Sequence, residues 1–239
     1  MLLDRLLQSQ GFGSRRECRG LVRHGHVAIA GVVRHDPFEE LGTLDPERFF
    51  FTVDGIDWPW RESAALVMNK PAGYECSRKP QHHPSVLSLL PAPLRERGVQ
   101  PVGRLDEDTT GLLILTDDGK LNHRLSSPKK KLPKVYHATC RHGITDSMLE
   151  ALKAGVLLHD EPEPIAAADA EALDEHRLRL TLREGKYHQV KRMVAATGNR
   201  VDALERVSIG GLALPHDLPP GEWRWLSAAD IERLTQADA

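Results

Sequence analysis

The hydrophobic and polar positions of this chain repeat with two different periods, which predicts a mixture of helices and strands. Near the N-terminus, Cys18, Leu21 and Val22 have the i, i+3 and i+4 spacing of an amphipathic helix. Ser14 and Glu17 have the Ser-x-x-Glu spacing of a capping box, so we expect this helix to begin after Ser14.

The strands are predicted from short alternating or apolar runs. Gly25 is expected to end the first helix, and residues 27–29 and 32–33 then form two strands joined by a turn at Ala30-Gly31. Residues 66–68 form a short apolar run that Asn69-Lys70-Pro71 stops, and further strands are predicted at residues 112–115, 135–140 and 177–183. The last run alternates Leu with Arg or Thr and leads into a helix that carries Lys191 and ends near Gly198. Short alternating strands mixed with helices predict an α+β fold around a largely antiparallel sheet.

Charged residues are distributed unevenly over residues 1–60. The net charge is only -2, yet residues 1–35 hold six Arg against two acids, while residues 36–60 hold seven acids against one Arg. Arg15, Arg19 and Arg23 share one face of the predicted helix, and Arg16 lies beside them. Such a face is either simply solvated or a phosphate-binding patch, and the absence of interleaved acids favours the patch.

This N-terminal stretch resembles the S4 RNA-binding domain. The resemblance rests on Leu3-Asp4-Arg5-Leu6, on the Gly-x-x-Ser-Arg-Arg string that begins at Gly11, and on the hairpin from Gly25 to Gly31. It implies RNA contact, which we assign to Arg15, Arg16, Arg19 and Arg23. Trp58-Pro59-Trp60, followed by charged residues, is interpreted as a linker. We therefore expect an S4-like domain over residues 1–60 and a second domain over residues 61–239.

A loop rich in charged and hydroxyl residues precedes the predicted strand at residues 112–115. It contains Asp106 and Asp108, and an Asp-Gly turn at Asp118-Gly119 is expected to close the strand. A carboxylate beside a buried strand can have a tuned protonation state, although many such loops only cap helices or contact solvent. The two acids do not suit a glycosidase pair, because residues two apart in an extended segment point to opposite faces.

Three strings resemble the motifs of bacterial rRNA pseudouridine synthases. They are Gly103-Arg104-Leu105-Asp106 followed by Thr-Thr-Gly-Leu-Leu, then Lys134-Val135-Tyr136, and then the segment from Glu184 to Met193. The resemblance implies a catalytic domain built on a mixed, largely antiparallel sheet. It also implies a reaction that needs no cofactor.

Within that family, the chain resembles the small-subunit enzymes most. The residues that carry this resemblance are at 73–77, 83–86, 108–110 and 187–192. It implies conversion of one uridine, U516, of 16S rRNA to pseudouridine, with 16S rRNA or a small-subunit assembly intermediate as the partner. A synthase for the large-subunit (23S) rRNA and a non-catalytic RNA-binding assembly factor are the alternatives.

The resemblance also assigns roles to residues. Asp106 is the expected catalytic carboxylate, Tyr136 is expected to stack on the flipped base, and Lys191 is expected to pair with Asp106. From the hydrophobic pattern alone, Lys191 and Arg192 would be assigned to the solvent-exposed face of a helix. Because neighbouring helical residues point about 100° apart, only one of them is expected to reach Asp106. The other RNA contacts are expected from Arg104, Lys129, Lys130, Lys134 and Arg192.

Other features argue against several classes of protein. Cys18, Cys76 and Cys140 lie far apart, and the histidines lack an His-Glu-x-x-His pattern, so we expect no metal site. Apolar runs stay far below the roughly 18 residues of a membrane span, and the N-terminus lacks the pattern of a signal peptide. We therefore expect a cytoplasmic protein. We also expect it to act as a monomer.

Overall fold

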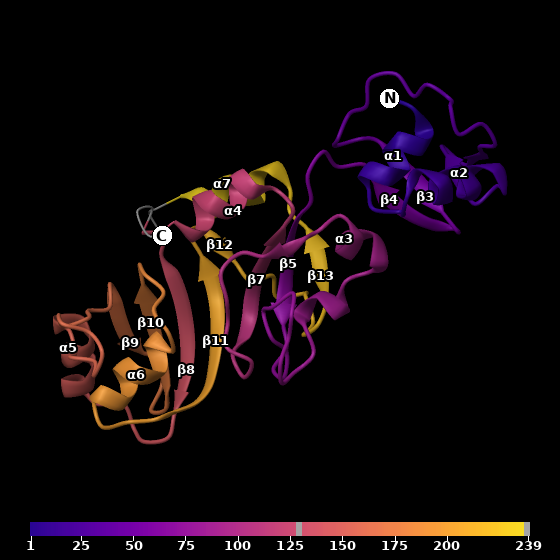
Figure 1. Ribbon diagram of the computed structural model, residues 1–239. Coiled ribbons are helices and arrows are strands. Elements are labelled where there is room, and N and C mark those ends of the chain that lie inside the picture. The colour runs from indigo at the N-terminus through magenta and orange to yellow at the C-terminus, as the bar shows by residue number, and fades with distance from the viewer. Residues whose placement is uncertain (128–130, 237–239) are drawn as a thin grey trace. The chain divides into compact units, whose positions relative to one another are not determined.

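The computed structural model describes residues 1–127 and 131–236 and divides into two compact units (Figure 1). The first unit comprises Met1–Ala64 and Leu90–Gln100, and the second comprises Ala65–Leu89 and Pro101–Ala239. No described helix combines the length and apolar character needed to cross a membrane.

The first unit packs two helices against a small sheet. The helices α1 and α2 contact each other, and the sheet has the strand order β2-β1-β3-β4 with antiparallel neighbours. Leu3, Leu6, Cys18 and Val22 from the helices meet Phe51 from the sheet in one buried core. The elements of this part of the chain are α1 (Leu3–Ser9), α2 (Arg15–Arg23), β1 (Val27–Ile29), β2 (Val32–Val33), β3 (Phe50–Val53), β4 (Ile56–Pro59) and α3 (Ala92–Glu96).

The predicted helix and hairpin are confirmed. Ser14 caps α2, its side chain accepting from Glu17 N while the Glu17 carboxylate accepts from Ser14 N, which is the complete capping box. Ala30 and Gly31 both have positive φ, at 50° and 75°, as a two-residue hairpin turn requires.

The prediction of a linker at Trp58-Pro59-Trp60 was wrong. Trp58 and Pro59 belong to β4, which pairs with β3, and Trp58 and Trp60 pack against the buried core. The reason is that β4 is an edge strand, where a proline removes no hydrogen bond that the sheet needs. We therefore propose a domain boundary between residues 60 and 64. Residues 90–100 also belong to the first unit, where Arg97 Nη1 donates to Gln10 Oε1 at 2.6 Å.

The second unit is built on one large sheet. Its path runs β13-β5-β7-β11-β8-β10-β9, with β12 paired to β11 and β6 paired to β7. The strands are β5 (Ala65–Lys70), β6 (Gln100–Pro101), β7 (Thr110–Thr116), β8 (Lys134–Cys140), β9 (Asp169–Ala172), β10 (Arg177–Leu182), β11 (Val201–Ile209), β12 (Leu212–Ala213) and β13 (Trp223–Trp225). The remaining elements are η1 (Val86–Leu89), α4 (Gly119–Ser126), α5 (Asp146–Ala154), α6 (Gln189–Ala196) and α7 (Ala228–Thr235).

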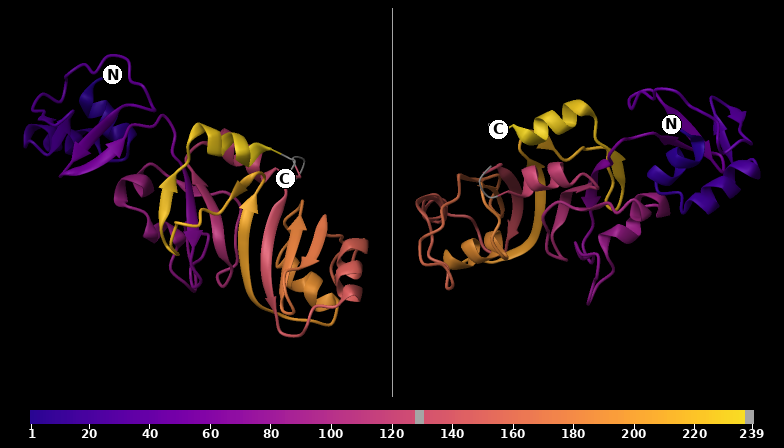
Figure 2. Two further views of the ribbon diagram at one scale, coloured as in Figure 1. Left: turned by 180° about the vertical axis from the view of Figure 1, so that it is seen from behind. Right: turned by 45° about the horizontal axis from the view of Figure 1, so that its top comes forward.

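The sheet is mixed and mostly antiparallel, which confirms the predicted fold class. The strands β7 and β11 run parallel, and the other neighbours along the path run antiparallel. Figure 2 shows α4 and α7 beside each other, and both contribute to one buried cluster with β5, β7 and β11. At the other end, α5 packs against β9.

The Asp118-Gly119 pair begins a helix, and the prediction of a simple turn there was wrong. The Asp118 carboxylate accepts from Lys120 N at 2.8 Å and Leu121 N at 3.2 Å, and Gly119 is the first residue of α4. An Asp before a helix supplies acceptors for backbone N–H groups that have no partner inside the helix.

Gly111 is required at the junction between β7 and β11. It has a φ of 98°, and a Cβ added there would lie 2.4 Å from Arg206 O. Arg206 is itself buried, and its Nε donates to Leu112 O at 2.9 Å. The parallel junction therefore depends on two backbones that approach closely at a residue without a side chain.

Candidate active site

A cavity of about 970 Å³ in the second unit is lined by four of the predicted functional residues, Arg104, Asp106, Tyr136 and Lys191. Its walls come from three chain segments, residues 75–83, 103–109 and 184–191, and Tyr136 contributes from the sheet. A cavity of this size is within the range of small-molecule sites and accommodates a nucleotide.

Asp106 lies in the loop before β7, with its side chain 29% exposed. Lys191 Nζ lies 3.6 Å from Asp106 Oδ2, and His188 Nε2 lies 3.4 Å from Asp106 Oδ1. Both partners come from the start of α6, far along the chain. The structure thus brings Asp106 and Lys191 together, while the His188 contact was not predicted.

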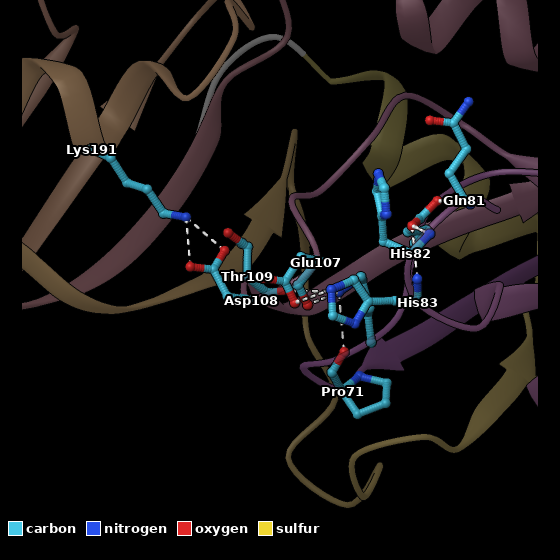
Figure 3. Close-up of polar contacts among 10 residues, drawn as sticks. Pro71, Gln81, His82, His83, Glu107, Asp108, Thr109 and Lys191 are labelled. Atoms are coloured by element: carbon cyan, nitrogen blue, oxygen red, sulfur yellow. Dashed lines mark hydrogen bonds and ion pairs between the residues drawn. The ribbon is translucent and has the colours of Figure 1, made fainter.

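Lys191 contacts Asp108 more closely than it contacts Asp106. Its Nζ donates to Asp108 Oδ1 at 2.6 Å and Oδ2 at 2.8 Å, as Figure 3 shows. The expectation that the two acids face opposite ways was wrong, because the chain turns here and Thr109 N donates to Asp106 O at 3.1 Å. Burial acts to raise the pKa of Asp108, but the hydrogen bonds and charge of Lys191 outweigh it and hold the pKa below its usual value.

Arg192 points away from the two carboxylates. Its guanidinium pairs with Asp160, and its Nη1 donates to Tyr187 O at 3.1 Å. Of the two neighbouring cations on α6, it is therefore Lys191 that reaches Asp106, as the angle between successive helical residues requires.

Tyr136 lines the cavity from β8 and is only 9% exposed. Arg104 is exposed and lies on the same cavity wall as Asp106. Lys134 does not line the cavity, and its Nζ donates to Leu132 O at 3.3 Å. Burial lowers the pKa of Lys134, and the nearby Arg206 lowers it further. Lys129 and Lys130 lie outside the described residues.

Lys70 is a central residue of the site that the sequence analysis missed. It is fully buried at the end of β5, and its Nζ donates to the backbone carbonyls of Pro71, Glu107 and Thr109 at 3.1, 3.0 and 2.9 Å. Burial lowers the pKa of Lys70, while the thiol of Cys76 and the carboxylates of the loop oppose that change. Lys70 therefore fixes the turn that carries Asp106. The sequence did contain a signal for this role, because Lys70 ends an apolar strand directly before a proline.

The opposite wall of the cavity is organised by Glu75. Its carboxylate accepts backbone N–H groups from Gln81, His82 and His83 at 3.1, 2.8 and 2.9 Å (Figure 3). The His82 hydrogen bond, followed by the other two, lowers the pKa of Glu75. Within the described residues, no group of three or more His, Cys, Asp or Glu side chains is arranged to hold a metal ion.

The arginines of α2 belong to the first unit and differ in their surroundings. Arg19 Nε contacts the buried Asp4 carboxylate at 2.8 Å, and its guanidinium lies 4.9 Å from the centre of the Phe38 ring. Arg15 donates to Gln8 Oε1 at 3.2 Å and is exposed, as are Arg16 and Arg23. Arg19 thus has a structural role, and the other three remain exposed on the helix.

Comparison with known proteins matches both parts of the chain. Residues 64–196 match the RNA pseudouridylate synthase family, and residues 1–42 match the S4 domain. A relative from Yersinia pestis, named ribosomal small subunit pseudouridine synthase A, is 44% identical and covers 97% of this chain and 97% of its own length. A relative of the same name from Escherichia coli (strain K12) is 39% identical, with coverage of 97% and 98%.

Two further similar proteins align with all or nearly all of the chain. A Bacillus subtilis (strain 168) protein described as an uncharacterized RNA pseudouridine synthase is 38% identical over 100% of both chains. A crystal structure of a pseudouridylate synthase superposes with a TM-score of 0.69 at 34% identity, covering 98% of this chain and 99% of the other. With a family match over more than half of its length and relatives along nearly all of it, this chain belongs to the RNA pseudouridylate synthase family and carries an S4 domain at its N-terminus.

Proposed function

We propose that the protein converts one uridine of the small-subunit rRNA to pseudouridine, with U516 as the target and Asp106 as the catalytic carboxylate. The relatives from Yersinia pestis and Escherichia coli, which are named for the ribosomal small subunit, support the choice of substrate. The S4 domain and the exposed Arg15, Arg16 and Arg23 on α2 support contact with the rRNA backbone.

The reaction requires a carboxylate and a shielded pocket, and it requires no redox partner. The N1–C1′ bond of uridine breaks, the uracil turns, a C5–C1′ bond forms, and the proton on C5 is lost while N1 gains one. Nothing is oxidised or reduced overall. The target base must first leave its stack at a cost of about a few kcal/mol, which contacts inside the cavity have to offset.

The observation that carries the proposal is the position of Asp106 in the wall of the cavity that Tyr136 also lines, with Lys191 Nζ 3.6 Å from its carboxylate. Attack of the carboxylate on the ring, attack on C1′ and removal of the 2′ proton all need an ionised carboxylate close to the nucleoside. Lys191 Nζ, at 3.6 Å from Asp106 Oδ2, is close enough to orient the carboxylate toward the nucleoside.

Tyr136 and Arg104 complete the proposed site. The ring of Tyr136 lies in the buried part of the cavity, where it stacks on the flipped uracil. Arg104 is exposed on the same wall as Asp106, where it fills the gap that the uridine leaves in the RNA stack or binds the adjacent phosphate. Lys134 and Arg192 are proposed to add positive charge for the RNA, and Lys129 and Lys130, which lie outside the described residues, are kept as proposed RNA contacts.

The test is to incubate the protein with unmodified 16S and 23S rRNA, both free and in ribosomal particles. New pseudouridines are mapped by carbodiimide treatment and primer extension. The matched variants are Asp106→Asn and Asp108→Asn, because both remove one charge from the same turn and both alter the surroundings of Lys191.

We expect one new stop, at U516 of 16S rRNA, that Asp106→Asn abolishes and Asp108→Asn only weakens. A stop in 23S rRNA alone would move the substrate to the large subunit and leave the chemistry in place. If Asp108→Asn abolished the stop and Asp106→Asn kept it, the catalytic role would belong to Asp108. RNA binding with no stop in any substrate would contradict the proposal and favour a non-catalytic assembly factor.

A further inference from the structure

Tyr187 and His188 form a stacked pair of rings at the cavity that holds Asp106. Their ring centroids lie 3.8 Å apart with 18° between the ring planes, and both residues line the cavity. His188 is the inner ring, since its Nε2 lies 3.4 Å from Asp106 Oδ1. Tyr187 is the outer ring and is 68% exposed, so most of its surface meets solvent.

The backbone under this pair is held in place by several contacts. His188 has φ 46° and ψ 35°, a left-handed conformation that is uncommon for residues other than Gly. Arg192 Nη1 donates to Tyr187 O at 3.1 Å, and Gln189 Oε1 accepts from Lys186 N at 2.9 Å. Lys186 is anchored in turn by the Glu161 carboxylate at 2.6 Å.

An exposed tyrosine on a fixed loop adds little to the core, but it is suited to stacking. A tyrosine ring has few rotatable bonds, so a ring that is already fixed loses little freedom when a base stacks on it. Nucleobases stack on such rings with little dependence on sequence. The surrounding wall supplies charges for the backbone of the same strand, from Arg104 and Lys79.

We propose that the Tyr187–His188 pair is a stacking platform for the unpaired base next to the target uridine. The inference rests on the proposed function, because flipping one uridine into the cavity leaves its neighbour without a stacking partner. Tyr136 is buried and serves the uracil inside the cavity, whereas Tyr187 is exposed and accepts a base that stays outside. The platform thus holds the RNA on both sides of the bond that reacts.

The experiment uses the full-length protein and a synthetic 16S rRNA segment around U516. The base on one side of the target, and then the base on the other side, is replaced by 2-aminopurine, whose fluorescence falls when it stacks on an aromatic ring. Binding is measured in an Asp106→Asn background, so that no turnover occurs, with Tyr187 kept, changed to Phe or changed to Leu. Because Tyr187 is mostly exposed, circular dichroism is expected to report the same fold for all three proteins.

We expect quenching at one of the two neighbouring positions with Tyr187 and with Tyr187→Phe. With Tyr187→Leu the quenching should disappear and the Kd should rise about 5- to 150-fold. Removing the same base, by an abasic nucleotide, should weaken binding of the Tyr187 protein and have little further effect on the Leu variant. Quenching that is equal for Tyr187 and Tyr187→Leu, or no quenching at either position, would overturn the proposal of a stacking platform. If quenching occurs but the protein with Asp106 intact makes no pseudouridine, the platform stands and the proposed function fails.

Discussion

Lys191 contacts both carboxylates of one turn, Asp106 and Asp108, and this sharing determines the effect of removing its ammonium. Without the ammonium, Asp106 and Asp108 face each other as like charges inside a partly buried cavity. The neighbouring Arg192 cannot replace it, because its guanidinium is engaged by Asp160 and Tyr187 O.

We therefore expect Lys191→Met to lower the single-turnover rate of pseudouridine formation by about 100-fold or more, and Lys191→Arg to recover part of it. Because the folded-state pKa of Asp108 is lowered, the stability from its pair with Lys191 is present above about pH 4 and is lost as pH falls through the folded pKa. Melting curves of wild type and Lys191→Met should therefore converge below about pH 4. An unchanged rate in Lys191→Met would contradict the role given to this residue.

Lys70 holds the same turn in place through its hydrogen bonds to backbone carbonyls. The variant Lys70→Met leaves the carbonyls of Glu107 and Thr109 without their buried donor, so we expect a loss of about 1–3 kcal/mol in unfolding free energy. Urea denaturation measures this loss, and the activity should fall with it because the turn that carries Asp106 moves. The exposed Lys153 of α5 provides the control, since Lys153→Met should change neither quantity.

At the scale of elements, the parallel contact between β7 and β11 is the most constrained part of the sheet. The variant Gly111→Ala forces a Cβ against Arg206 O and places Ala at a φ of 98°, so we expect a loss of about 1–3 kcal/mol in stability. The displacement of β7 should also reduce activity, because Thr110 and Gly111 closely follow the loop that carries Asp106.

Gly119→Ala is the matched control for that substitution. Its added Cβ would meet no atom within 4 Å, and Gly119 is the first residue of α4. Thermal unfolding should therefore show Gly119→Ala to be neutral or more stable by up to about 1 kcal/mol. Equal melting temperatures for the two variants would show that β7 and β11 tolerate more separation than the structure implies.

The role in RNA binding that is proposed for α2 can be tested separately from its role in folding. Arg16 and Arg23 are exposed, so the variant Arg16→Gln/Arg23→Gln should keep its stability. The slope of log K against log salt for rRNA binding should become shallower by about 0.7–0.9 for each lost phosphate contact. Arg48→Gln, at an exposed site of the same unit, should leave the slope unchanged. A stable Arg16→Gln/Arg23→Gln protein with the wild-type slope would remove α2 from the RNA interface.

At the scale of the whole molecule, the sequence predicted what depends on neighbours along the chain. The capping box at Ser14, the hairpin at Ala30 and the alternating strand at 177–182 are local patterns, and all three are present. The motif resemblance then predicted that Asp106 and Lys191 lie close together.

The features that escaped prediction depend on contacts between distant segments. Lys70 reads as a surface lysine until the strand beside it is known, and the contact of His188 with Asp106 requires the packing of α6. Asp106 and Asp108 lie on the same side because Thr109 N donates to Asp106 O in a turn, where the sequence analysis expects an extended segment. The edge position of β4, which makes Pro59 acceptable, likewise emerges only from the strand order.

The parallel junction of β7 and β11 also sets the order in which the protein can fold. Arg206 reaches Leu112 across 94 residues of chain, and Lys191 reaches Asp108 across 83, so both contacts close long loops. The capping box of α2 and the hairpin of β1 and β2 close within a few residues, and such local contacts form sooner. In pulsed hydrogen exchange during refolding, amides of α2 should be protected before those of β7 and β11. Early protection of β7 would contradict this order. During synthesis the α2 surface therefore forms before Lys191 reaches Asp108. The chain can thus bind RNA before it can modify it.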